Sequence, residues 1–206
     1  YKANDMVKAD CGGCNGCSRC CHGMGNSIIL DPYDVYRMTT GMGKSMQELL
    51  AASVELNVVD GVILPNLKMQ GAEEACAYLD GEGRCSIHPY RPGICRLFPL
   101  GRYYENGGFS YFLQIGECAK ENRSKIKVSK WIDTPDLTRN QQFTLQWHDL
   151  LHAMEERLTG EDEGKQREEN LLLLRLFYLL PYEGTIDFYT QFTERMEHWN
   201  GQNGQI

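Results

Sequence analysis

Cysteine thiols are the residues of this chain whose spacing most clearly indicates chemistry. Nine cysteines occur, and none lies beyond residue 118: Cys11, Cys14, Cys17, Cys20, Cys21, Cys76, Cys85, Cys95 and Cys118. The first five fall within residues 11–21, where each is at most three positions from the next. A Cys-x-x-Cys turn directs two sulfur atoms to the same side, so this density indicates that thiolates ligate a metal.

Disulfide bonding is the main alternative explanation of the cysteine pattern. Disulfide frameworks are typical of short secreted chains, whereas this chain has 206 residues and shows no signal peptide. Neighbouring cysteines such as Cys20 and Cys21 also have poor geometry for disulfide bonds. Buried cysteines without ligands do not cluster this densely. We therefore expect reduced, metal-binding cysteines and a cytoplasmic location.

The spacing leaves the identity of the metal open. The run Cys11-x2-Cys14-x2-Cys17 has the spacing by which bacterial ferredoxins present three ligands to a [4Fe–4S] cluster. A zinc site could equally use Cys14 and Cys17 with a second pair such as Cys85 and Cys95. Eight thiols make two four-ligand sites and nine leave one over, so the division of the thiols among sites also stays open.

Composition limits the classes of partner. The formal net charge is -7, which argues against nucleic acid as a partner. No apolar run approaches the roughly 18 residues that a membrane span needs, so we expect no membrane partner. Hydrophobic residues make up 42% of the chain, which is enough for a core. We expect an α+β fold that forms one folded unit and is stapled by metal.

Turn and cap signals predict the individual elements. Asp60-Gly61 predicts a hairpin over residues 56–70, and Asn106-Gly107-Gly108 predicts another over 101–116. The turn Asp80-Gly81-Glu82-Gly83 predicts a third hairpin over 76–88. Residues 1–130 thus form a loop- and hairpin-rich metal-binding region. Residues 131–206 are predicted to be mostly helical and to pack on that region.

Two further segments carry local signals. Asp31-Pro32 supplies an N-cap and a proline in the first helical position, so a helix is expected to follow. Residues 120–130 hold five basic residues and one acid, which favours a solvated connector.

Several motifs in order resemble the YkgJ-type cysteine-cluster family, also called the CxxCxxCC family. They are Cys14-x2-Cys17-x2-Cys20-Cys21, Cys76, Cys85-x2-His88, Arg91-Pro92-x2-Cys95-Arg96-x2-Pro99 and Cys118. The resemblance covers roughly residues 11–120 and implies a zinc- or iron-chelating domain. It implies as ligands Cys14, Cys17, Cys20, Cys21, Cys76, Cys85, Cys95 and Cys118. Cys11 lies outside the four-cysteine signature and is a further candidate.

The resemblance and the residues together support three hypotheses of function. The first is a metal-binding protein with an iron–sulfur cluster, used in redox chemistry or in modifying a protein or peptide side chain. The second is a structural zinc module that acts through protein–protein interaction. The family includes the flagellin lysine N-methylases, which implies a methylase using S-adenosylmethionine as the third. The sequence names no catalytic residue and no oligomeric state.

Arginines flank the later cysteines and are candidates for contact with a cofactor. Arg91 and Arg96 could donate charge-assisted hydrogen bonds to metal-bound thiolates, or bind an anionic group of a substrate beside the metal.

Two other motifs have simpler alternatives. Gly41-Met42-Gly43-Lys44-Ser45 resembles the end of a P-loop, but Met38 occupies the position where the motif requires glycine. His148 and His152 are four residues apart on a predicted helix, with Glu155 or Glu156 one turn on. Such a face can bind a metal, and it equally fits an ordinary exposed polar surface.

Overall fold

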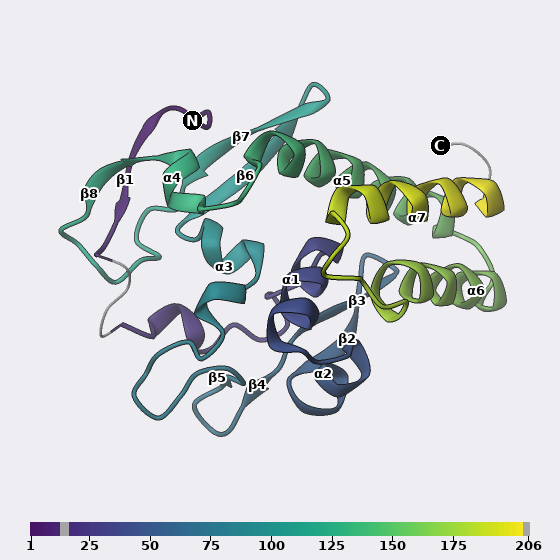
Figure 1. Cartoon of the computed structure of the whole chain (residues 1–206), viewed down its shortest axis with the longest axis horizontal. Helices are drawn as coiled ribbons and strands as arrows, with labels where there is room; N and C mark the ends of the chain where they lie inside the picture. The colour runs from purple at the N-terminus through teal and green to yellow at the C-terminus, as the bar shows by residue number, and fades with distance from the viewer. Residues whose placement is uncertain (13–16, 204–206) are drawn as a thin grey trace. The chain divides into compact units, whose positions relative to one another are not determined.

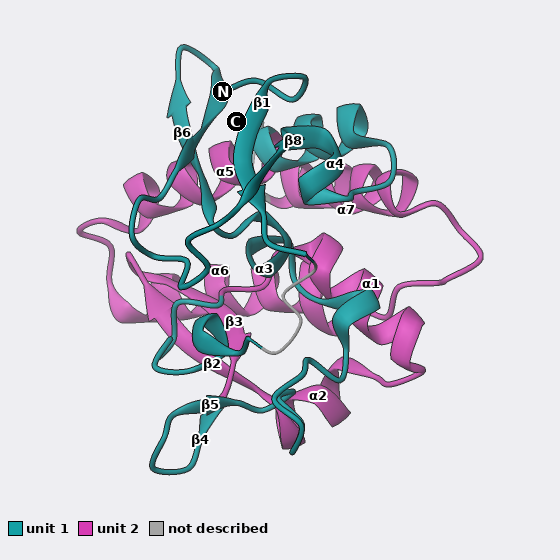
Figure 2. Ribbon diagram, turned by 90° about the vertical axis from the view of Figure 1, so that its left-hand side faces the viewer, with its two compact units in different colours: residues 1–28, 69–145 teal, residues 29–68, 146–206 magenta. Residues whose placement is uncertain are grey.

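Strands pair two by two and run antiparallel in the computed structural model, which describes residues 1–12 and 17–203. Helices supply most of the remaining regular structure, so the predicted α+β class is confirmed. Backbone contacts group the chain into two units, each built from two separate stretches (Figure 2). Unit 1 comprises residues 1–28 and 69–145, and unit 2 comprises residues 29–68 and 146–206. The predicted boundary between a metal-binding region and a helical region at residue 130 stays a prediction.

Unit 1 combines short strands with short helices. Its strands are β1 (Met6–Asp10), β4 (Met69–Gln70), β5 (Ala75–Cys76), β6 (Leu100–Glu105), β7 (Gly108–Leu113) and β8 (Ser124–Lys127). Its helical segments are η1 (Arg19–Cys21), η2 (His88–Tyr90), α3 (Gly93–Leu97), α4 (Val128–Ile132) and the first part of α5 (Leu137–Leu158). Strands β1, β6, β7 and helices α3 and α4 share one apolar core: Val7, Ala9, Leu97, Leu100, Tyr111, Val128 and Ile132.

The basic stretch at residues 120–130 is not a solvated connector, so that expectation was wrong. Residues 124–127 form β8, which pairs with β1, and Val128 begins α4 with its side chain fully buried. Lysines alternate here with Ile126 and Val128, which is the period of a half-buried strand. The expectation of a connector was based on the number of basic residues and did not take this alternation into account. The Trp131 ring nitrogen then donates hydrogen bonds to the carbonyls of Leu97 (3.2 Å) and Phe98 (3.1 Å), and so ties α4 to the end of α3.

Two of the predicted hairpins are confirmed. Strands β2 (Val54–Val59) and β3 (Val62–Leu67) meet at Asp60-Gly61, and β6 and β7 meet at Asn106-Gly107 (Figure 1). Asp60 and Asn106 both have a φ of 50°, and the glycine after each is also left-handed. This is the backbone that a tight two-residue turn demands, which explains why the sequence signal succeeded.

Unit 2 contains the hairpin β2–β3 and most of the helical residues. Its helices are α1 (Pro32–Met42), α2 (Met46–Ala52), the later part of α5, α6 (Glu163–Leu174), the π-helical turn η3 (Arg175–Leu179) and α7 (Phe188–Asn203). The predicted start of α1 is confirmed, because Asp31 and Asp34 form a capping box ahead of it. Gly43, in the left-handed conformation, ends the helix.

Aromatic side chains fill the core of unit 2. The Phe177 ring lies 5.1 Å from that of Trp147 and 5.8 Å from that of Phe192, measured between ring centroids. Trp199 on α7 is fully buried, and the Tyr178 hydroxyl donates a hydrogen bond to the carbonyl of Leu30. Helices α5 and α7 and the turn η3 therefore share one core, as the sequence periodicity favours. None of the helices among the described residues is long and apolar enough to cross a membrane.

Asn170 joins α6 to the turn of the β2–β3 hairpin. Its amide oxygen accepts a hydrogen bond from the Ile63 amide at 2.6 Å, and its amide nitrogen donates to the Gly61 carbonyl at 3.1 Å. The Asn170 side chain is almost completely buried. Replacing it would leave backbone groups of the hairpin without their partners.

We expect Asn170→Ala to lower the free energy of unfolding by about 1–3 kcal/mol, measured by chemical denaturation. Lys165→Ala on the same helix is the matched control, because Lys165 pairs with Glu161 at the exposed surface. The control should change the unfolding free energy by less than about 0.5 kcal/mol. Equal shifts for the two variants would contradict a bridging role for Asn170.

Candidate metal centre

Backbone pairing in unit 1 brings the cysteines of η1 to Cys76. His22 forms an isolated antiparallel bridge with Ala75, and the Gly23 amide donates to the Glu74 carbonyl at 3.0 Å. Cys21 immediately precedes the bridged residue on one strand, and Cys76 immediately follows it on the other. Backbone pairing therefore holds two thiols that are distant in the sequence side by side.

A compact turn carries Cys85 back towards Cys76. The Leu79 amide donates to the Cys76 carbonyl at 2.8 Å, and Leu79 forms an isolated bridge with Cys85. The Asp80 carboxylate accepts from the amides of Glu82 (3.0 Å) and Arg84 (2.8 Å), which closes the turn. The expected hairpin over 76–88 is thus a turn with a single bridge, because Cys76 pairs instead with Met69 of β4.

The same turn packs against the residues before η1. Gly83 has a φ of 73°, and the Ser18 hydroxyl lies 3.8 Å from the position that a Cβ atom on Gly83 would occupy. Ser18 also caps η1, since its carbonyl accepts the Cys21 amide at 2.8 Å. This contact places the turn between Cys76 and Cys85 next to the segment that carries Cys20 and Cys21.

Cys95 reaches the same region on α3. The chain passes from Cys85 through η2, where the His88 amide donates to the Cys85 carbonyl at 3.2 Å. Pro92 then precedes α3 with an extended backbone, and its carbonyl accepts the Arg96 amide. Arg96 is 4% exposed and so belongs to the buried side of α3.

Electrostatic interactions tie five thiols into one group. Cys21 interacts with Cys20, Cys76 and Cys95, and Cys85 interacts with Cys76. We call Cys20, Cys21, Cys76, Cys85 and Cys95 the cysteine centre. Their side chains are partly buried, and no disulfide joins any of the eight cysteines within the described residues.

A hydrogen bond joins the Cys20 and Cys21 side chains. A hydrogen bond from Cys21 lowers the pKa of Cys20 to about 6, helped by the positive charge of Arg91. The same hydrogen bond, together with burial and the neighbouring thiols, raises the pKa of Cys21 far above that of an ordinary thiol. One thiolate is therefore stabilised within the group, and further thiolates are disfavoured unless a cation replaces the protons.

Backbone amides two residues after a cysteine also stabilise thiolates. Burial raises the pKa of Cys76, and a hydrogen bond from the Tyr78 amide partly offsets the increase. Burial likewise raises the pKa of Cys85, whereas a hydrogen bond from the Ile87 amide and the positive charge of Arg91 lower it. The sequence analysis did not predict the amides of Tyr78 and Ile87. The local signal that could have indicated these two amides is their position, two residues after a cysteine in a predicted turn.

Arg91 acts electrostatically on two thiols of the cysteine centre. Its charge acts on both Cys20 and Cys85. Together with burial, Arg91 and Arg84 lower the pKa of His88, so its ring is neutral near pH 7, as a metal ligand must be. Arg96 lies directly after Cys95, and its predicted contact with a cofactor stays a prediction.

The remaining predicted ligands lie elsewhere on the chain or outside the described residues. Cys11 follows β1, whose last residue, Asp10, pairs with Ser124 at the start of β8. The Ser124 hydroxyl also donates to the Asp10 carboxylate at 3.0 Å, so the segments that carry Cys11 and Cys118 reach the same end of this ladder. Cys17 and Cys118 are partly buried. Cys14 lies outside the described residues.

The donor set of the cysteine centre fits zinc or an iron–sulfur cluster. Thiolates are the soft ligands that both prefer, and the amide donors and Arg91 supply compensating positive charge. Within residues 1–12 and 17–203, no three His, Cys, Asp or Glu side chains already converge closely enough to hold a metal ion.

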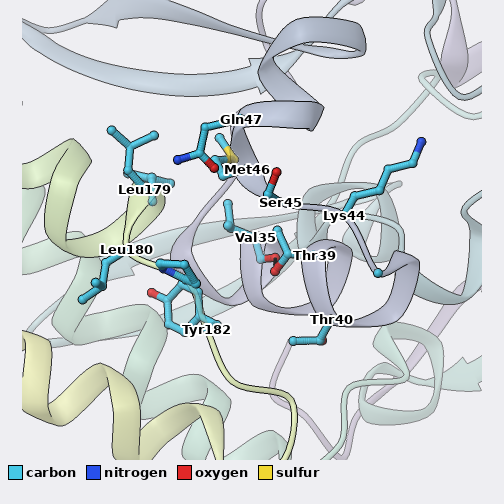
Figure 3. A pocket seen from close by; sticks show the side chains of 13 residues that line it. Val35, Thr39, Thr40, Lys44, Ser45, Met46, Gln47, Leu179, Leu180 and Tyr182 are labelled. Atoms are coloured by element: carbon cyan, nitrogen blue, oxygen red, sulfur yellow. Dashed lines mark hydrogen bonds between the residues drawn. The ribbon is translucent and has the colours of Figure 1, made fainter.

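The P-loop-like segment serves a structural purpose in unit 2. Gly43 ends α1, and the Ser45 hydroxyl and Glu48 carboxylate cap α2. Gly43, Lys44 and Ser45 line a pocket together with residues 178–182, and the Lys44 side chain extends away from the other side chains that line it (Figure 3). The segment follows a helix and caps two helix ends, which is not the arrangement of a phosphate-binding loop.

Comparison with known proteins agrees with the donor set. The CxxCxxCC family model, described as "Putative zinc- or iron-chelating domain", matches residues 13–126. No curated protein and no solved structure matches the chain. The match covers more than half of the chain and every described residue of the cysteine centre. The chain belongs to the CxxCxxCC family of zinc- or iron-chelating domains.

Proposed function

We propose that the cysteine centre holds an iron–sulfur cluster, used in redox chemistry or in modifying a side chain of a protein or peptide. The observation that carries the proposal is the number of thiols that interact in unit 1. Five thiols from four segments form one electrostatic group, whereas a structural zinc ion takes four ligands. Cys11, Cys14, Cys17 and Cys118 are additional candidates, and the first three have ferredoxin-like spacing.

The protein residues around the thiols would tune such a cluster. A bound iron–sulfur cluster would supply electron transfer or a Lewis-acidic iron, with a potential set by charge and by hydrogen bonds to sulfur. The amides of Tyr78 and Ile87 are directed at Cys76 and Cys85. Hydrogen bonds to the cluster sulfur atoms favour the reduced, more negatively charged state of the cluster, and the positive charge of Arg91 favours the same state.

Arg91 also gives the centre a means of binding a substrate. Its side chain is half-buried and carries a positive charge beside Cys20 and Cys85. A guanidinium group in this position can bind a carboxylate of a peptide through paired hydrogen bonds. Arg96 is nearly inaccessible to solvent, so Arg91 is the better candidate for contact with a substrate.

Metal analysis on protein purified without oxygen tests the proposal directly. We expect brown protein with visible thiolate-to-iron absorption, and iron and acid-labile sulfide in roughly equal amounts, at about four of each per [4Fe–4S] cluster. Colourless protein with about two zinc ions per chain would overturn the proposal in favour of a structural zinc module.

Substitution of Arg91 tests its action on the thiolates. Arg91→Gln should weaken metal retention by about 10–100-fold, measured by competition with a chelator, because it removes a positive charge beside two ligands. Arg84→Gln is the matched control, since Arg84 is exposed in the same segment and its charge acts on His88. If the two variants lose metal equally, Arg91 has no special role at the centre.

Metal removal should loosen the turn around the thiols and spare unit 2. Hydrogen exchange is expected to accelerate at the amides of Leu79 and Ser86, whose bonds to Cys76 and Tyr78 hold the turn together. Exchange at the Ile63 amide, bonded to Asn170, should stay unchanged. Unchanged protection at all three amides would show that the turn folds independently of metal.

A further inference from the structure

Two histidines on α5 form a pair outside the cysteine centre. His148 and His152 are four residues apart, and their ring centroids are separated by 6.4 Å. Their side chains are 37% and 59% exposed. Residues four apart on a helix lie on the same face, so rotation of the side chains can bring both rings onto one ion. The helix backbone needs no change for this.

Each ring has a carboxylate beside the same nitrogen. The Nδ1 atom of His148 lies 3.4 Å from the Asp149 carboxylate, and that of His152 lies 3.6 Å from the Glu156 carboxylate. Metal-bound histidines characteristically direct their second nitrogen at a carboxylate, which orients the ring and increases the basicity of the ligand nitrogen. With Nδ1 directed in this way, Nε2 is the nitrogen of both rings that would ligate a metal.

The rest of this face suits a cation. Glu155 follows His152 by three residues and His148 by seven, so it lies on the same side of α5. It could supply a third ligand oxygen. The nearby Arg157 is paired with Glu169 at 2.7 Å, and its charge is thereby offset. The histidine pair thus lies among carboxylates, which attract divalent cations.

We propose that His148 and His152 bind a divalent transition metal ion of the Zn²⁺, Ni²⁺ or Cu²⁺ class through their Nε2 atoms. Imidazole nitrogens suit these ions, whereas hard ions such as Mg²⁺ and Ca²⁺ take oxygen ligands. Two protein nitrogens leave coordination positions for water or for Glu155. The site is therefore open and exchanges its ion readily, unlike a closed thiolate site. It does not depend on which metal the cysteine centre holds.

Titration with Ni²⁺ tests this site. Untagged protein that retains its own metal is titrated by calorimetry, and we expect one additional Ni²⁺ per chain without thiolate-to-nickel charge-transfer absorption. His148→Gln and His152→Gln should each weaken this binding at least about tenfold, because a single ring loses the advantage of chelation. Bound Ni²⁺ should also broaden the NMR signals of these two rings before those of His22, His88 and His198.

His198→Gln is the matched control. His198 is an exposed histidine on α7 of the same unit. No second histidine lies three or four residues from it in the sequence, and the Gln202 amide lies 2.8 Å from its ring. The control should bind Ni²⁺ as the wild type does, and circular dichroism checks that all variants are folded. Binding that survives His148→Gln and His152→Gln, or that is lost equally in the control, overturns the proposal. Charge-transfer absorption on Ni²⁺ addition would place the ion on the cysteines and overturn it as well.

Discussion

The pairing of residues 22–23 with residues 74–75 is the constraint on which the cysteine centre depends. It holds Cys21 next to Cys76, although the whole stretch 29–68 lies between them in the sequence and belongs to unit 2. Closing so long a loop costs conformational entropy. That stretch begins and ends at one point, because Ile29 bridges Asn66 and the Leu30 amide donates to the Pro65 carbonyl at 2.9 Å. Pairing between the two ends of this stretch therefore offsets part of the conformational entropy lost when the thiols are brought together.

Charge explains why a cation would stabilise these thiols as a group. The hydrogen bond between Cys20 and Cys21 lets one thiolate form easily and makes the next one costly. Arg91 and the amides of Tyr78 and Ile87 offset part of the negative charge, but five thiolates exceed what they can balance. A divalent metal or a cluster that replaces the protons removes this repulsion.

Local signals in the sequence predicted the local structure, and non-local pairing escaped prediction. The turns at Asp60-Gly61 and Asn106-Gly107 and the cap at Asp31 are each set by a few neighbouring residues. The expected hairpin over 76–88 was wrong in detail, because Cys76 pairs with Met69 through β4 and β5. The strand at 124–127 was missed because its partner, β1, lies more than a hundred residues earlier. Cysteine spacing and motif order predict which thiols are candidate ligands, whereas the electrostatic grouping of the cysteine centre depends on distant pairings such as that of His22 with Ala75.

The distribution of apolar side chains differs between the two units. Unit 2 has a core rich in large aromatic rings, including Phe177, Phe192 and Trp199. The apolar core of unit 1 lies between β1, β6, β7, α3 and α4. Around the thiols of residues 17–22 and 76–90, only Tyr78 and Ile87 are buried hydrophobic residues. Segments that bury so little apolar surface need another source of stability, and metal–thiolate bonds supply it in small domains. The cysteines in this region are thus candidate ligands whose bonds to a metal would supply the stability that a larger apolar core would otherwise give.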